Sequence, residues 1–96
     1  MYESVRASHI LVQTEDEAKQ LLEEIKSGKV AFEDAAAMHS LCPSGARGGD
    51  LGFFTKGQMV KPFEDAAFSM KKGEVSNPIQ TQFGWHLIQL VDAKEA

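Results

Sequence analysis

The chain has 96 residues, of which 43% are hydrophobic and 25% charged, a balance typical of one compact globular domain and not of a disordered segment. Its formal net charge is -4 at pH 7, and Lys71 and Lys72 are its one adjacent pair of basic residues, which argues against nucleic acid or an anionic membrane as the main partner. No apolar run approaches the roughly 20 residues that a membrane-spanning helix needs.

The first predicted element is a strand over residues 5–12. It is rich in β-forming residues, and apolar side chains occupy both of its faces. A strand of this kind is expected at the centre of a sheet, where both faces are covered.

A helix is predicted directly after this strand. Thr14 and Glu17 have the spacing of a capping box, with Thr14 as the N-cap. Gly28 is expected to end the helix. Its apolar face has the i, i+3, i+4, i+7 spacing and consists of Ala18, Leu21, Leu22 and Ile25.

A second helix is predicted over residues 31–39, with Phe32, Ala35 and Ala36 on one face. Pro43 and the glycines that follow it are expected to end any helix, which makes residues 45–49 a loop. A short strand over residues 51–54 comes next. Its last two residues, Phe53 and Phe54, are expected in the core, as are Met59, Phe63, Phe68 and Trp85.

The third helix is predicted to start near Pro62, which suits a first helical turn, and to close at Gly73. A short strand over residues 79–81, a hairpin connection over residues 82–84 and a last strand over residues 85–91 complete the chain. In the last strand His86, Ile88 and Leu90 share one face. Helices clustered between strands, with a hairpin at the end, predict an α+β domain with a mostly antiparallel sheet.

The glycine-rich run at residues 45–52 resembles a phosphate-binding loop only superficially. Such a loop needs a strand before it and a helix directly after it, whereas here a helix precedes and a strand follows. The run also lacks the Gly-Lys-Ser/Thr signature. We therefore interpret it as a tight structural loop whose glycines supply positive φ angles.

The side chains that could carry chemistry are few. His9 and His86 lie in predicted strands and, from their surroundings alone, fit hydrogen-bonded core residues. A zinc site would need further ligands, and only His39 and Cys42 could add to them at a poor spacing. Cys42 with a histidine could also form a hydrolase pair, although Pro43 follows it where an oxyanion-binding helix would begin.

Cys42 also bears on the compartment. A single cysteine cannot form an internal disulfide, which fits a reducing environment. The segment at residues 1–6 lacks the basic and apolar regions of a signal peptide. A cytoplasmic location is therefore expected, although a domain excised from a larger exported protein would look the same.

Several separate motifs resemble the parvulin family of peptidyl-prolyl isomerases. ASHILV at residues 7–12 is similar to the first strand of that family, and CPSGARGGDLGFF at residues 42–54 to its glycine-rich loop and second strand. GQMVKPFEDAAF at residues 57–68, GEVSNPI at residues 73–79 and FGWHLI at residues 83–88 complete the resemblance. It runs in order from about residue 5 to residue 90.

This resemblance implies an α+β fold in which three to four helices wrap a four-stranded, mostly antiparallel sheet of the FKBP-like superfold. Residues 1–96 would form one domain with a core at about residues 5–91. Carried over by position, Leu51, Met59 and Phe63 would seat the proline ring, with Phe83 as a further substrate contact. The resemblance implies a catalytic role for four polar residues: His9, Cys42, Thr81 and His86. The family uses no metal or organic cofactor.

The activity implied by the resemblance is rotation about Xaa-Pro bonds in flexible protein segments. Because no bond is broken, Cys42 is expected to tune the groove and not to act as a nucleophile, and the histidines to fix the groove through a mutual hydrogen bond and not to shuttle protons. The acidic segment QTEDE at residues 13–17 would repel a phosphate, so no dependence on phosphorylation is expected. The alternatives are a peptide-binding or chaperone module and a cysteine hydrolase. Proline-containing peptides are the expected partners, and a monomer the expected state.

Overall fold

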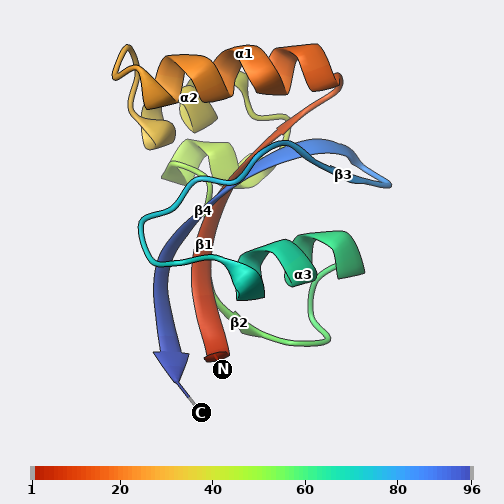
Figure 1. Ribbon diagram of the computed structural model, residues 1–96. Helices are drawn as coiled ribbons and strands as arrows, with labels where there is room; N and C mark the ends of the chain where they lie inside the picture. The colour runs from red at the N-terminus through yellow and green to blue at the C-terminus, as the bar shows by residue number, and fades with distance from the viewer. Residues whose placement is uncertain (1, 96) are drawn as a thin grey trace.

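The computed structural model describes residues 2–95 as one four-stranded sheet with helices packed against both of its faces (Figure 1). The strands are β1 (Tyr2–Val12), β2 (Asp50–Thr55), β3 (Ile79–Thr81) and β4 (Gly84–Glu95). The helices are α1 (Glu15–Lys26), α2 (Phe32–His39), the short 3-10 helix η1 (Pro43–Arg47) and α3 (Lys61–Ser69). The predicted α+β fold is confirmed.

The sheet has the strand order β2-β1-β4-β3, and its three strand pairs are antiparallel. The prediction of a central first strand is therefore correct. β1 and β4 pair along almost their whole length, from Tyr2 opposite Glu95 to Val12 opposite Trp85. Both ends of the described chain consequently lie together at one end of the sheet, as Figure 1 shows.

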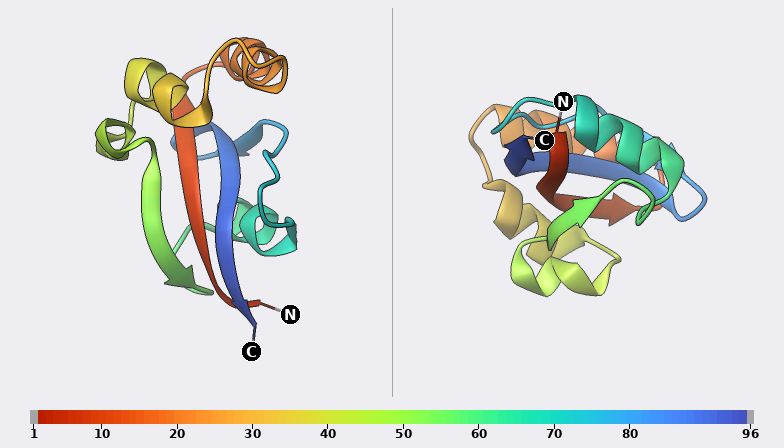
Figure 2. Two further views of the ribbon diagram at one scale, coloured as in Figure 1. Left: turned by 90° about the vertical axis from the view of Figure 1, so that its left-hand side faces the viewer. Right: turned by 90° about the horizontal axis from the view of Figure 1, so that it is seen from below.

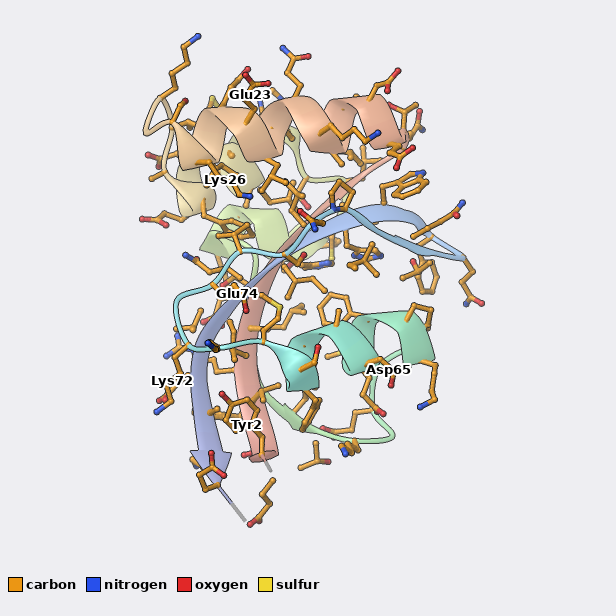
Figure 3. The ribbon with its side chains drawn as sticks, viewed as in Figure 1. Tyr2, Glu23, Lys26, Asp65, Lys72 and Glu74 are labelled. Atoms are coloured by element: carbon orange, nitrogen blue, oxygen red, sulfur yellow. The ribbon has the colours of Figure 1, made fainter. Side chains whose placement is uncertain are left out.

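Because side chains alternate along β1 and β4, the two faces of the sheet pack against different helices. On one face Ile10, Val12 and Leu87 are buried under α1 and α2. On the other face Val5, Ile88 and Leu90 pack against Phe63 and its neighbours in α3. The helices also divide the length of the sheet, because α1 and α2 gather at one end and α3 lies nearer the other (Figure 2). Figure 3 shows the same division in the side chains, with Glu23 of α1 at the end opposite Tyr2.

The start of α1 agrees with the prediction at its N-cap. Thr14 has an extended backbone, and its hydroxyl oxygen accepts the backbone N–H of Glu17 at 3.2 Å. The Glu17 carboxylate accepts from the same hydroxyl at 3.1 Å. In a full capping box the Glu17 carboxylate would accept from the backbone N–H of Thr14. Here it accepts from the Thr14 side chain instead, so only the Thr14 half of the capping box is formed.

Two sequence predictions are wrong in detail. Residues 45–49 were expected to be a loop, but Pro43 begins a 3-10 helix that runs to Arg47, because proline suits the first turn of a helix as well as it breaks one. Phe53 was expected in the core but is 42% exposed. The backbone at Gly52 has φ +72, so the side-chain alternation of β2 is interrupted and Phe54 takes the buried position. Within residues 2–95, none of the helices is long and apolar enough to cross a membrane.

Candidate functional site

The two histidines lie next to each other on the face of the sheet that α3 covers. In the β1–β4 register His86 is opposite Leu11 and His9 is opposite Ile88, so the histidines are diagonal neighbours. Their rings are stacked with centroids 5.1 Å apart, and the two Nδ1 atoms are 2.9 Å apart. The expected mutual hydrogen bond is therefore present in the structure.

Thr81 extends this bond into a chain that starts at the β3–β4 turn. The backbone N–H of Phe83 donates to Thr81 Oγ1 at 3.1 Å, and Thr81 Oγ1 lies 2.8 Å from His86 Nε2. In the contact between the two Nδ1 atoms one imidazole donates and the other accepts, and His86 uses its second ring nitrogen for Thr81. The other nitrogen of His9, Nε2, is buried and has no hydrogen-bond partner within residues 2–95.

Burial keeps both rings neutral at pH 7. Loss of water contact, and secondarily the charge that His86 can carry, lowers the pKa of His9 from 6.5 to about 4. Burial also lowers the pKa of His86. Both histidines are less than 10% exposed. The pair is therefore a polar but uncharged surface at neutral pH.

A groove of about 420 Å³ opens above this pair. Phe63 of α3 meets both imidazoles edge to face, with its centroid 5.5 Å from that of His9 and 5.4 Å from that of His86. Apart from the histidines, the groove is bounded by apolar side chains, the Cys42 thiol and one amide. The lining residues are His9, Leu11, Cys42, Leu51, Gln58, Met59, Val60, Phe63, Phe83 and His86.

Seven of the eight residues that the resemblance implied line this groove. The eighth, Thr81, acts from behind it through its contact with His86. Sequence reasoning missed Leu11, Gln58 and Val60. Leu11 could have been found because it is two residues from His9 and so shares its face of the strand. Gln58 and Val60 flank Met59 in a turn, where no periodicity indicates which side chains face inward.

Cys42 is held against β1 by the hydroxyl of Ser40. This oxygen accepts the backbone N–H groups of Leu11 at 3.1 Å and of Cys42 at 3.3 Å. The Cys42 thiol accepts a hydrogen bond from Ser44 Oγ at 3.3 Å. Among the described residues neither histidine is bonded to it, because their ring nitrogens bond to each other and to Thr81 or, for His9 Nε2, to nothing. The thiol lacks the paired base that a hydrolase nucleophile needs.

The glycine-rich run has a structural task beside His9. The backbone N–H of His9 donates to the carbonyl of Gly49 at 2.9 Å. Gly49 has φ +85, and a Cβ there would lie 2.3 Å from the His9 carbonyl oxygen. Only glycine allows so close an approach. The run therefore fixes the strand that carries His9, as a tight structural loop would.

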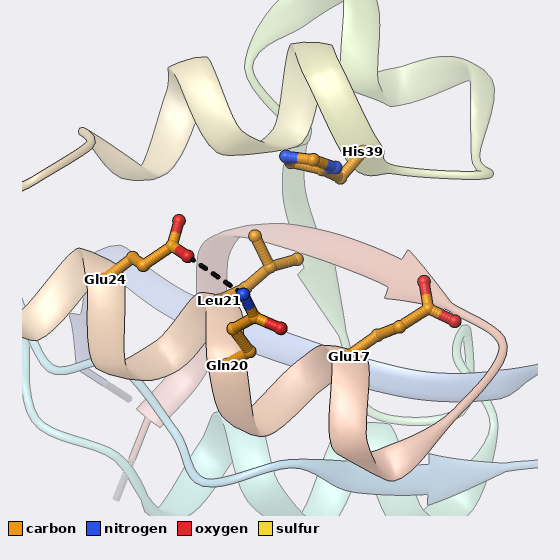
Figure 4. A pocket seen from close by; sticks show the side chains of 5 residues that line it. All are labelled: Glu17, Gln20, Leu21, Glu24 and His39. Atoms are coloured by element: carbon orange, nitrogen blue, oxygen red, sulfur yellow. Dashed lines mark hydrogen bonds between the residues drawn. The ribbon is translucent and has the colours of Figure 1, made fainter.

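A second hollow, of about 280 Å³, lies between α1 and His39 of α2 (Figure 4). Its walls are mainly polar, and Gln20 donates to Glu24 across one side at 3.4 Å. Glu17, Glu24 and His39 do not converge, and no group of three or more potential metal ligands is found within residues 2–95. The groove above the histidines is the candidate functional site.

Comparisons with known proteins show the family of the chain. The family model described as Rotamase, PPIC-type PPIASE domain, matches residues 7–92. Foldase protein PrsA 1 of Bacillus cereus is 52% identical over 92 residues, which cover 95% of this chain and 32% of that protein. A probable parvulin-type peptidyl-prolyl cis-trans isomerase of Bordetella pertussis is 46% identical over 91 residues, covering 93% of this chain and 35% of that protein. The chain thus spans about a third of the length of these curated relatives.

Solved structures of the same family have the same fold. The peptidylprolyl isomerase PrsA of Bacillus anthracis superposes with a TM-score of 0.94 at 40% identity, covering 98% of this chain and 43% of that one. NmPin, the parvulin of Nitrosopumilus maritimus, superposes with a TM-score of 0.84 at 46% identity, covering 95% of this chain and 98% of that one. The second match shows that a chain of nearly this extent can make up a whole parvulin structure.

Proposed function

This chain belongs to the family of PPIC-type peptidyl-prolyl isomerase domains, the parvulins, and we propose that it accelerates cis/trans rotation of Xaa-Pro bonds in unfolded or flexible protein segments without a covalent step. The observation that carries the proposal is the groove itself. It is a largely apolar trough whose polar floor, the bonded pair of His9 and His86, is uncharged at neutral pH.

Such a groove favours the twisted amide over the planar one. Rotation about the bond faces a barrier of roughly 20 kcal/mol because amide resonance is lost. The planar amide carries more charge on its carbonyl oxygen than the twisted amide does. A groove lined by apolar side chains solvates that charge poorly, so it raises the energy of the ground state relative to the twisted state.

Orientation of the substrate would make the second contribution to the faster rotation. Leu51, Met59 and Phe63 stand together in the groove and would hold the proline ring while the preceding carbonyl turns. Phe63 is 3% exposed and packs on Phe54 and both histidines. Its position is therefore fixed by the core, and this gives the seat a rigid wall.

The polar residues have supporting tasks in this proposal. His9, His86 and Thr81 fix the floor of the groove through their chain of hydrogen bonds, and neither histidine is required as a proton shuttle. Cys42 forms a polar edge beside them and attacks no carbonyl. A monomer is the active form in this proposal.

We also propose that the activity is independent of phosphorylation. The ten lining residues include no Lys or Arg that could bond a phosphate. The segment that leaves β1, residues 13–17, is QTEDE and places Glu15, Asp16 and Glu17 in the first turn of α1. A phosphorylated side chain before proline would therefore find no cation in the lining of the groove.

The test is a protease-coupled assay, in which a protease cleaves only the trans form of a proline peptide. We expect the chain to speed the cis-to-trans phase, and Met59→Ala to reduce kcat/KM by about tenfold because part of the ring seat is lost. Phe53→Ala is the matched control, since Phe53 is exposed and lies outside the groove. Binding without acceleration would show a peptide-binding module. Cleavage of ester probes that thiol alkylation abolishes would show a hydrolase.

Phosphorylation is tested in the same assay with phosphoSer-Pro, Glu-Pro and Leu-Pro peptides. We expect kcat/KM for phosphoSer-Pro to be no higher than for Glu-Pro. A strong preference for the phosphopeptide would overturn this part of the proposal and leave the isomerase activity standing.

A further inference from the structure

The turn between β2 and α3 places one polar side chain, that of Gln58, in the lining of the largely apolar groove. Gln58 directly precedes Met59 of the proline seat, and its side chain is exposed. The other polar lining residues are the two histidines on the floor and Cys42 at the edge. Among the ten lining residues, Gln58 therefore supplies the one side-chain amide, at the rim beside the seat.

The orientation of this amide follows from its contact with Thr55. The backbone N–H of Thr55 donates to Gln58 Oε1 at 2.7 Å, and Thr55 Oγ1 lies 3.4 Å from the same oxygen. Because a backbone N–H can only donate, the amide oxygen must face Thr55 and the amide nitrogen must point away from it. Within residues 2–95, Gln58 Nε2 has no hydrogen-bond partner. It is therefore a donor that is still available to a ligand.

The backbone of the turn is fixed as well. The bond between Thr55 and Gln58 closes the turn, and the backbone N–H of Gly57 donates to the Glu64 side chain of α3. Glu64 is buried, which anchors the turn to the body of the domain. A donor that is already held in place loses little freedom when it binds a partner.

A bound proline residue has one backbone carbonyl that suits this donor. With the ring in the seat of Leu51, Met59 and Phe63, the carbonyl before proline is joined to the ring nitrogen and turns above the histidines. The carbonyl of the proline residue itself is joined to the ring at its α-carbon. It leaves the seat on the side away from the histidine floor, where the turn with Gln58 lies.

We infer that Gln58 is a further substrate-binding residue, whose Nε2 donates a hydrogen bond to the carbonyl oxygen of the bound proline residue. The inference rests on the proposed function and adds to it a contact that holds the ring in its seat. This carbonyl stays with the ring while the Xaa-Pro bond rotates, so the hydrogen bond is equally strong in the cis, trans and twisted states. An interaction of this kind lowers KM and leaves kcat unchanged.

The variant Gln58→Glu separates the donor from the acceptor of this side chain. It keeps an oxygen for the Thr55 N–H but has no N–H to give to a substrate. In the protease-coupled assay we expect KM to rise about fivefold, the effect of one lost hydrogen bond, and kcat to stay within about twofold. Gln80→Glu is the matched control, because Gln80 is exposed in β3 and lies outside the groove lining. It makes the same change of charge and should keep the KM of the unaltered chain.

Two peptides that differ only at the proline carbonyl identify the partner of Gln58. One ends in Leu-prolinamide and the other in Leu-prolinol, in which a hydroxymethyl group replaces the carboxamide. NMR exchange spectroscopy measures the cis/trans rates of both without a protease. We expect kcat/KM for the prolinamide to exceed that for the prolinol by about fivefold with the unaltered chain, and by about twofold or less with Gln58→Glu.

The outcomes separate the role of Gln58 from the isomerase activity. The same ratio of the two peptides in the unaltered chain and in Gln58→Glu would overturn the role of Gln58 and leave the proposed function intact. A lower kcat with unchanged KM would do the same. No acceleration of either peptide would overturn the proposed function and the inference with it. Circular dichroism shows whether the variants are folded, and a loss of active protein alone does not change the ratio.

Discussion

The two faces of β1 and β4 are built from alternate residues of the same strands, yet they differ in what they contain. Ile10 and Leu87 on one face are fully buried in an apolar cluster under α1 and α2. His9 and His86, the neighbouring residues on each strand, face a groove, and the buried His9 Nε2 has no hydrogen-bond partner within residues 2–95. The first face is fully packed at these positions, whereas the second leaves an open groove.

The comparison teaches that the groove depends on the opposite face for its geometry. The strand that positions His9 is fixed by Ile10 and Val12 on its far side and by Gly49 at its edge. An open, partly unsatisfied site can persist only where its surroundings hold it in place. Changes on the core face should therefore reduce stability, and changes on the groove face should alter activity and its dependence on pH.

The largest effect is expected on the core face. Ile10→Ala removes most of a side chain that is 0% exposed and leaves a cavity among Ala18, Phe32 and Leu87. We expect a loss of about 4 kcal/mol in the free energy of unfolding, measured by urea titration. Ile10→Val should lose about 1 kcal/mol and keep the kcat/KM of the folded protein. A Val variant that is stable but inactive would break the division between the faces.

The second effect is a dependence of stability on pH that arises at His9. Because the pKa of His9 falls from 6.5 to about 4 on folding, the unfolded chain binds a proton first as the pH drops. Stability is therefore complete above pH 6.5, falls between pH 6.5 and about 4, and this contribution levels off below that. From the shift in pKa, the loss is up to about 3 kcal/mol.

Urea unfolding at pH 7 and pH 4.5 measures this loss. His9→Leu should reduce the difference between the two pH values and leave the part that the lowered pKa of His86 contributes. His39→Gln, at the exposed end of α2, should keep the full difference. An equally steep dependence in the His9 variant would place its origin elsewhere.

The third effect concerns the turn that presents Met59. The Glu64 side chain of α3 is 9% exposed and accepts the backbone N–H of Gly57 at 2.5 Å. Glu64→Leu keeps the bulk but loses the acceptor, and we expect a loss of about 2 kcal/mol in stability together with a KM about fivefold higher because the seat is looser. Glu64→Gln keeps an oxygen for Gly57 and should recover most of both. Equal effects of Leu and Gln would show that the hydrogen bond does not position the turn.

The smallest effect is expected at Cys42. Cys42→Ser keeps a polar edge near the floor and should retain kcat/KM within about threefold, since no covalent step is required. Its thermal unfolding midpoint is the control for folding. Complete loss of activity in a folded Ser variant would show that the thiol takes part in the chemistry.

Most of the fold could be predicted from the sequence because its signals are local. Thr14, the apolar face from Ala18 to Leu22 and the Phe32 face of α2 lie where they were expected. The errors arise where one residue type is compatible with two local structures. Pro43 starts a short helix as readily as it ends one, and Gly52 changes which phenylalanine of β2 points inward. The last strand runs to Glu95, beyond residue 91, because its end pairs with Tyr2.

The site was less predictable from the residues themselves. Periodicity placed His9 and His86 among core residues, which is correct for their burial but says nothing about their contact. Their Nδ1 atoms meet because of the register between strands that are distant in sequence. The resemblance to a known family supplied that pairing, together with Thr81. The individual residues could not supply it, because register depends on the whole sheet.

The pairing of Tyr2 with Glu95 has a consequence for how this domain can be attached to other proteins. The two attachment points are neighbours across one strand pair, and His9 lies seven residues along β1, which is roughly 23 Å away. The domain could therefore be inserted into a surface loop of a carrier protein and be connected to it at both ends. The histidine pair at the floor of the groove would then lie at a distance from the attachment points.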